Sequence, residues 1–191
     1  MRKRLLLTAA AGAALLAAAG CSATVNGPAR DDPLARRRRI DAAVDAALGR
    51  LSTQVPESRE LVAKASGTLV FPEVITAGFV VGASYGEGAL RRQGRSVAYY
   101  RLVSAAAGLL AGAQSRALYL LFMTQEALAK FESSNGWTAG ADASVAVATL
   151  GANGAIDVRA LQAPVIGFVL TNAGLMANLS LEGTKISRLD V

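Results

Sequence analysis

Small and larger residues alternate with a period of two between Thr68 and Leu90. Glycines take one parity (Gly78, Gly82, Gly86 and Gly88), and bulkier residues take the other (Phe79, Val81, Ala83 and Tyr85). Because strand side chains point alternately to two faces, the pattern predicts a strand with one bulky and one nearly bare face. Glycine inside a strand costs stability, so we expect the sheet to bend sharply or another backbone to approach closely here.

Two helices are predicted ahead of this stretch. The first follows Arg36–Arg39, and its apolar stripe is formed by Ile40, Val44, Ala47, Leu48 and Leu51. Pro56 disfavours helix at the residue before it, which separates a second, shorter helix that we expect Gly67 to cap.

Strands and one more helix are predicted after the glycine-rich stretch that ends at Leu90. Residues 91–95 resemble a hairpin tip, residues 96–113 and 117–123 favour buried strands, and Thr124 is placed to cap a helix over Gln125–Phe131. Alternation returns over residues 140–147, and further strands are expected at 165–170 and 175–181. The fold class is therefore α+β, with a mostly antiparallel, strongly curved, glycine-rich sheet, N-terminal helices and one short mid-chain helix.

Composition excludes several kinds of chemistry. The 191 residues include no histidine and one cysteine, so histidine-based triads, the common zinc sites and an intrachain disulfide are excluded. The net charge is +6, and Arg2, Lys3 and Arg4 supply three of these charges, so the remainder is too weakly basic to argue for nucleic acid. We expect no cofactor, no metal and no enzyme activity, since the carboxylates are thinly scattered.

The N-terminus is typical of an exported lipoprotein. Arg2, Lys3 and Arg4 precede a Leu/Ala-rich run that is short for a membrane span, and Ala18-Ala19-Gly20-Cys21 resembles a lipobox whose cysteine is acylated. We therefore expect a signal peptide over 1–20, an acylated flexible tether over 21–34 and one domain over 35–191. Ser22 after the cysteine resembles signals for outer-membrane delivery, facing the periplasm.

Two arginine clusters are candidate lipid-binding residues: Arg36, Arg37, Arg38 and Arg39, and the hairpin-tip residues Arg91, Arg92 and Arg95. Juxtamembrane basic residues gain about 1 kcal/mol each against anionic lipid, and guanidinium groups bind phosphate bidentately. The alternative is that both clusters are ordinary solvated surface.

A polar, small-residue face is also predicted. If the strands align, Asp142 shares this face with Ser84, Gln114, Asn172 and Asn178. Such a face either lines a ligand groove, packs against another element or is the solvated side of the sheet. Phe79, Phe131 and Trp137 are expected in the core.

Several short segments together resemble the SYLF domain. They are LVFP (69–72), AGFVVG (77–82), YGEG (85–88), the glycines and Gln114 of 108–114, WTAGADA (137–143), GLM (174–176) and SLEG (180–183). Leu110 and residues 148–150 depart from the family pattern, where glutamine and glycine are usual. The resemblance covers roughly Ile40 to Val191.

The resemblance implies a lipid-binding function. SYLF domains occur in bacterial lipoproteins and in eukaryotic proteins that bind phosphoinositides and act on actin at membranes. The expectation is a non-catalytic, membrane-anchored envelope lipoprotein whose domain binds anionic or phospholipid head groups, with no actin partner. The alternative is an envelope scaffold that binds a protein partner.

The lipobox predicts that Cys21→Ser abolishes acylation and releases the protein from the membrane. Each buried methylene contributes about 0.8 kcal/mol, so acyl chains hold a protein more firmly than a basic patch does. Membrane fractionation with and without detergent measures the release. A Cys21→Ser protein that stays in the membrane fraction would show the lipobox assignment to be wrong.

Overall fold

A computed structural model describes residues 32–78, 81–107, 112–149, 156, 161–172, 174–175, 181 and 183–191 of the chain. Asp32–Val191 forms a compact unit of its own. The signal peptide, Cys21 and nearly all of the expected tether lie outside the described residues, as do Phe79 and Asn178.

Two helices begin this unit, as the sequence predicts. Helix α1 spans Pro33–Gln54, and Asp32 caps it by accepting a hydrogen bond from the Leu34 backbone N–H at 3.1 Å. Its buried residues are Ile40, Val44, Ala47 and Leu51, which confirms the predicted stripe. Helix α2 spans Ser58–Lys64. Gly67 does not cap α2, because Ala65 ends the helix in an extended conformation and Gly67 begins the first strand.

The stretch from Thr68 to Leu90 forms two strands, which corrects the prediction of a single strand. Strand β1 spans Gly67–Gly78, and β2 spans Val81–Arg92. They pair antiparallel, with Gly78 opposite Gly82. The strands are joined through residues 79 and 80, where the sequence shows only apolar residues and no turn signal.

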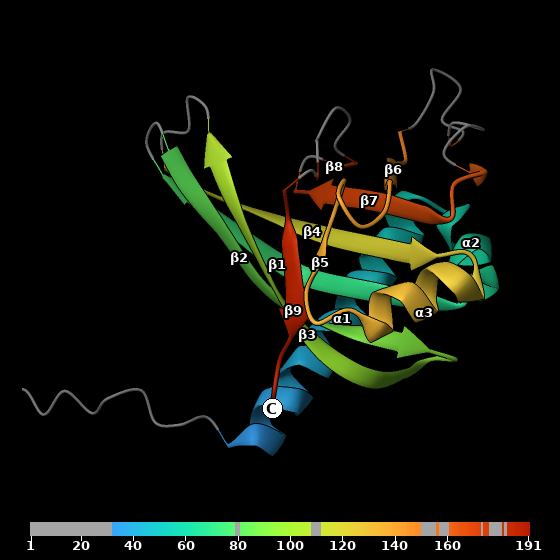
Figure 1. Ribbon diagram of the computed structural model, residues 1–191, viewed down its shortest axis with the longest axis horizontal. Coiled ribbons are helices and arrows are strands. Elements are labelled where there is room, and N and C mark those ends of the chain that lie inside the picture. Colours follow the sequence, from blue (N-terminus) through green and yellow to red (C-terminus); the bar gives the residue numbers. More distant parts are fainter. Residues whose placement is uncertain are drawn as a thin grey trace, which may run out of the picture. The chain divides into compact units, whose positions relative to one another are not determined.

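The remaining strands complete one sheet (Figure 1). They are β3 Arg95–Ala107, β4 Gly112–Phe122, β5 Trp137–Thr138, β6 Ala146–Val147, β7 Val165–Thr171, β8 Gly174–Leu175 and β9 Lys185–Arg188. The order is β5-β9-β3-β2-β1-β4-β7-β6, with β8 paired to β7. The β6–β7 pair is parallel, so the α+β prediction is confirmed with a mixed sheet that is mostly antiparallel.

A bulge in β1 lies against the glycines of β2. The register of β1 shifts around Pro72 against both neighbouring strands, and proline, which has no N–H to donate, is tolerated at such a bulge. A Cβ added to Gly88 would lie 2.0 Å from the Val70 carbonyl oxygen and 2.8 Å from a Phe71 ring carbon. The bare face of β2 is therefore occupied by the backbone and side chains of β1, which confirms the predicted close approach.

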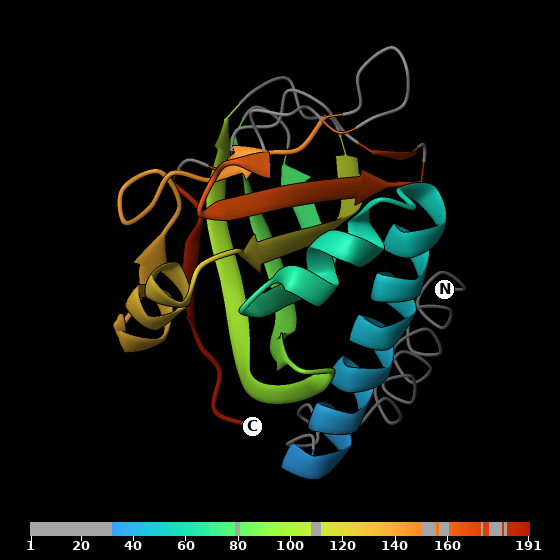
Figure 2. The same ribbon diagram turned by 90° about the vertical axis from the view of Figure 1, so that its right-hand side faces the viewer.

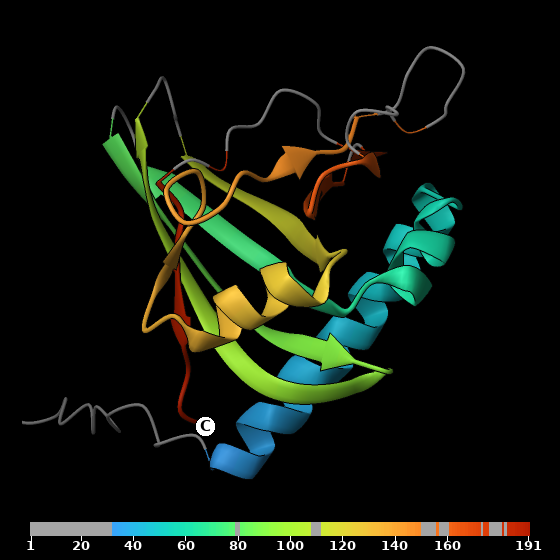
Figure 3. The same ribbon diagram turned by 45° about the vertical axis from the view of Figure 1, so that its right-hand side comes forward.

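The sheet is covered on both faces (Figures 2 and 3). Helix α1 lies across one face, called the outer face here, and α3 (Gln125–Ser133) lies on the other, the inner face. The outer core joins the α1 stripe to Val70, Tyr119 and Phe168. The inner core packs Phe122 and Tyr100 around Phe131, with ring centroids 4.8 and 4.9 Å from its ring. Phe131 and Trp137 are buried, as predicted.

Several boundaries differ from the sequence prediction. The residues of 140–147 form a turn and the two-residue β6, because the backbone of Gly140, Ala141 and Asp142 hydrogen-bonds locally. Of the strand expected over 175–181, β8 holds Leu175, and residues 176–180 lie outside the described part. Strand β9 was not predicted, since only Ile186 in it is buried and its alternation is too short to detect. Thr124 caps α3 as expected, accepting from the Ala127 N–H at 3.1 Å.

The close approach at the hairpin predicts a position-specific loss of stability. A Cβ at Gly82 would lie 2.5 Å from the Ala77 carbonyl oxygen, whereas the Ala83 side chain is exposed. Gly82→Val should therefore lower the free energy of unfolding by about 2 kcal/mol or more, and Ala83→Val by less than about 1 kcal/mol. Urea or thermal denaturation of both variants measures this, and equal stability of Gly82→Val and the parent would refute the close approach.

Candidate functional site

The β2–β3 hairpin tip is fastened to α1 by Arg91. Gln93 and Gly94 make the turn with positive φ angles of 50° and 77°. The Arg91 guanidinium donates to the Asp45 carboxylate at 2.6 Å, to the Asp41 carbonyl oxygen at 3.2 Å and to the Gly94 carbonyl oxygen at 2.9 Å. The Arg91 side chain is only 11% exposed. Arg91 is therefore part of the contact between α1 and the sheet, although the sequence predicts it at an exposed hairpin tip.

Asp41 of α1 makes further hydrogen bonds in this contact. Its carboxylate accepts hydrogen bonds from the Ser96 hydroxyl at 2.5 Å and from the Tyr99 hydroxyl at 2.9 Å. Burial, and then the bond to Asp41, raises the pKa of Tyr99. Arg37 lies over the Tyr99 ring at 5.8 Å and donates to the Val191 carbonyl oxygen at 2.7 Å. The N-terminal half of α1 thus binds β3 and the C-terminal residue.

A second ionic contact joins the first turn of α1 to β2. Arg36 forms a salt bridge with Glu87, and the Tyr85 hydroxyl donates to the same carboxylate at 2.7 Å. The hydrogen bond from Arg36 holds the pKa of Glu87 below its usual value against the opposing effect of burial. Burial, together with Glu87, raises the pKa of Tyr85. Glu87 is therefore a charged partner for α1, which explains a carboxylate in the middle of a glycine-rich strand.

The remaining predicted arginines stay at the surface. Arg38, Arg39, Arg92 and Arg95 are exposed, and Arg92 lies 3.6 Å from Glu132 of α3. The two clusters, far apart in sequence, meet around one end of α1, because the hairpin tip packs on the helix through Arg91 and Ser96. Arg36, Arg37 and Arg91 thus bind the fold together, although Arg37 is exposed like Arg38, Arg39, Arg92 and Arg95.

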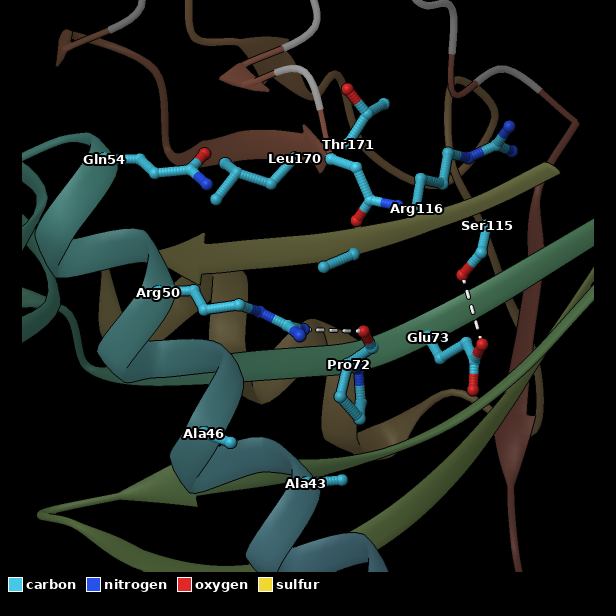
Figure 4. A pocket seen from close by; sticks show the side chains of 12 residues that line it. Ala43, Ala46, Arg50, Gln54, Pro72, Glu73, Ser115, Arg116, Leu170 and Thr171 are labelled. Carbon is cyan, nitrogen blue, oxygen red and sulfur yellow. Dashed lines mark hydrogen bonds between the residues drawn. The ribbon is translucent and has the colours of Figure 1, made fainter.

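A groove runs along α1 over the β1 bulge (Figure 4). It consists of two adjoining hollows of about 490 and 250 Å³, which share Ala43, Pro72 and Glu73. In the larger hollow Arg50 donates to the Pro72 carbonyl oxygen at 3.3 Å, and the Ser115 hydroxyl donates to Glu73 at 3.2 Å. The groove therefore offers guanidinium, hydroxyl and carboxylate groups to a small polar ligand or head group.

Arg116 borders the same hollow. It pairs with Val74 of β1, whose side chain lies in the inner core, so Arg116 belongs to the inner face of the sheet. Its side chain points away from Arg50 in Figure 4. Burial lowers the pKa of the Arg116 guanidinium. Arg50 and Arg116 therefore lie on opposite faces of the sheet and do not bind one anion together.

The polar face predicted from the sequence forms only in part, because Ser84 and Gln114 both pair with Thr76 and so share the inner face. Ser84 is buried and hydrogen-bonded to Thr76 at 2.8 Å, whereas Gln114 and Asn172 are exposed. Asp142 lies in a turn, where its carboxylate accepts from the Thr138 backbone N–H at 2.5 Å. Among these residues, packing accounts for Ser84 and local turn formation accounts for Asp142.

Sequence reasoning missed the groove and an exposed apolar surface on β1, β2 and β3. Ile75 and Tyr85 contribute to both features. Their positions in the sequence place them on one face of the sheet only once the β1–β2 hairpin is recognised and its strands are aligned. Within the described ranges, no three potential ligands of the types His, Cys, Asp or Glu gather closely enough for a metal. None of the described helices is both long and apolar enough to cross a bilayer.

Comparison with known families supports the resemblance inferred from the sequence. Residues 103–190 match the family Ysc84, which is described as Las17-binding protein actin regulator. This is the SYLF domain, so the resemblance is confirmed over that range. No curated protein matches the chain.

The contacts of Arg91 predict that it stabilises the fold. Arg91→Gln removes the charge-assisted bond to Asp45, so the free energy of unfolding should fall by about 1–2 kcal/mol. Arg95→Gln at the same tip is the matched control, because its side chain is exposed, and should change stability by less than about 0.5 kcal/mol. Thermal denaturation measures both, and equal melting temperatures of Arg91→Gln and Arg95→Gln would contradict the assignment.

Proposed function

We propose that this chain, whose residues 103–190 match the SYLF family, is an acyl-anchored envelope lipoprotein whose domain binds anionic lipid head groups without catalysis. Cys21 is the proposed anchor, and the proposed location is the outer membrane, facing the periplasm. The family description names an actin regulator; we propose no actin partner here, because the lipobox directs the protein out of the cytoplasm.

One observation carries the head-group proposal. The two arginine clusters converge on the N-terminal half of α1, where Arg38, Arg39, Arg92 and Arg95 are exposed. Helix α1 begins at Pro33, shortly after Cys21, so these cations follow the proposed anchor closely along the chain. Exposed basic residues close to an anionic membrane gain about 1 kcal/mol each, and the gain falls off within a Debye length.

Liposome binding by the compact unit Asp32–Val191 tests this proposal. The unit should sediment with phosphatidylglycerol vesicles and not with phosphatidylcholine vesicles, and salt should weaken the binding. Arg38→Gln/Arg95→Gln should reduce partitioning about thirtyfold, at about 1 kcal/mol per residue and about 1.4 kcal/mol per factor of ten.

The matched control is Arg59→Gln/Lys64→Gln, which removes two exposed charges from α2. This variant should bind vesicles like the parent. If the parent ignores phosphatidylglycerol even at low salt, the head-group proposal fails, and a scaffold that binds an envelope protein becomes the better account.

A further inference from the structure

Beyond the edge of α1, large apolar side chains of the sheet are exposed on its outer face. Val81 is 73% exposed, Ile75 and Tyr85 are each 47% exposed, and Val103 is 45% exposed. Ile75 pairs with Tyr85 and Tyr85 with Val103, so these three form one row across β1, β2 and β3. Directly paired residues point to the same face, so the row is one continuous surface.

The next row on this face, further from the β2–β3 hairpin tip, is made of alanine. Ala113, Ala77, Ala83 and Ala105 are paired in that order across β4, β1, β2 and β3, and all four are exposed. Together with Ile75, Val81, Tyr85 and Val103 they form one exposed surface, called the outer patch here. Single exposed apolar residues are ordinary, whereas a contiguous apolar surface over four strands marks a contact site.

Cations border the outer patch. Lys185 of β9 pairs with Val103, and Arg101 of β3 lies two residues before Val103 on the same face; both are exposed. Arg39 of α1 lines the smaller hollow together with Ile75 and Tyr85. The nearby carboxylates are Glu73, which accepts from Ser115, and Glu87, whose charge Arg36 balances. The border is therefore predominantly positive.

We propose that the outer patch is the surface that lies on the bilayer, with its apolar side chains at the boundary between head groups and acyl chains. Arg101, Lys185 and Arg39 then meet anionic head groups, and the Tyr85 ring takes the interfacial position that suits an aromatic ring with a polar end. The inference rests on the proposed lipid binding and adds an apolar contact surface to the exposed arginines already assigned to it.

The length of the tether is compatible with contact between the outer patch and the bilayer. Residues 22–31 separate Cys21 from Asp32, and ten extended residues span roughly 35 Å. Arg36, in the first turn of α1, contacts Glu87, which lies two residues after Tyr85 on the same face of β2. The start of α1 therefore lies next to the outer patch, and an acyl-anchored tether is long enough for the patch to reach the membrane that holds the anchor.

Site-specific fluorescence on Asp32–Val191 tests the inference, because this unit contains no cysteine. A polarity-sensitive fluorophore is attached to Val103→Cys and, as the control, to Gln125→Cys on α3. With phosphatidylglycerol vesicles the label at position 103 should shift to the blue and be quenched by brominated acyl chains. The label at position 125 should show neither effect.

A second comparison uses unlabelled variants in which two exposed apolar side chains are replaced by serine. Val81→Ser/Val103→Ser should weaken vesicle partitioning about tenfold, because two apolar side chains no longer enter the interface. Val97→Ser/Leu161→Ser removes two exposed apolar side chains outside the outer patch and should bind like the parent. Melting temperatures show that all variants are folded.

The outcomes separate this inference from the proposed function. If the parent does not bind phosphatidylglycerol vesicles, both fail. If the parent binds but both labels respond alike, or Val81→Ser/Val103→Ser binds normally, the outer patch is not the membrane surface while head-group binding stands. A blue shift at position 103 that depends on protein concentration, without vesicles, would assign the patch to a second copy and overturn the inference.

Discussion

The close contact between the β1 bulge and Gly88 of β2 is the constraint on which the rest of the structure depends. No Cβ fits at Gly88, since it would lie 2.0 Å from the Val70 carbonyl oxygen. A bulge bends its strand and increases the local twist, so the long hairpins curl. The inner face encloses α3 and the aromatic cluster around Phe131, and the outer face receives α1 over only part of its area. The groove over Pro72 and the uncovered outer patch both follow from that partial cover.

The charged residues of α1 have two separate tasks. Asp41 and Asp45 bind the hairpin tip through Ser96, Tyr99 and Arg91, and Arg36 binds Glu87. These contacts keep the helix in place on a sheet whose outer core is otherwise apolar. Other arginines in the same two segments, such as Arg38 and Arg95, are exposed. A basic run in the sequence therefore represents both fold-stabilising and outward-facing groups, and only the contacts distinguish them.

The parts of the fold that local patterns specify were predictable. The α1 stripe, the Thr124 cap, the hairpin tip at Gly94 and the close approach at the glycines follow from side-chain period and turn chemistry. The family resemblance came from the order of several short segments, and the match confirms it over residues 103–190. The break between β1 and β2 was missed, because the connection Phe79-Val80 is as apolar as a strand interior.

The candidate site was harder to predict, because it depends on pairing between distant segments. Arg91 lies at a hairpin tip in the sequence, and its burial comes from Asp45, which a local pattern cannot locate. The outer patch requires the register of β1, β2 and β3 and the path of α1 across them. Odd-numbered residues such as Tyr85 and Val103 look like core positions by alternation, and they are exposed because α1 covers the neighbouring rows instead.

The most direct test of the account is paramagnetic broadening of the amide and methyl NMR signals of Asp32–Val191 on phosphatidylglycerol nanodiscs that carry a spin-labelled lipid. The account predicts that signals of Ile75, Tyr85 and Val103 broaden most, while those of Leu128 in the inner core remain sharp. Broadening centred on α3, or spread evenly over both faces of the sheet, would contradict it.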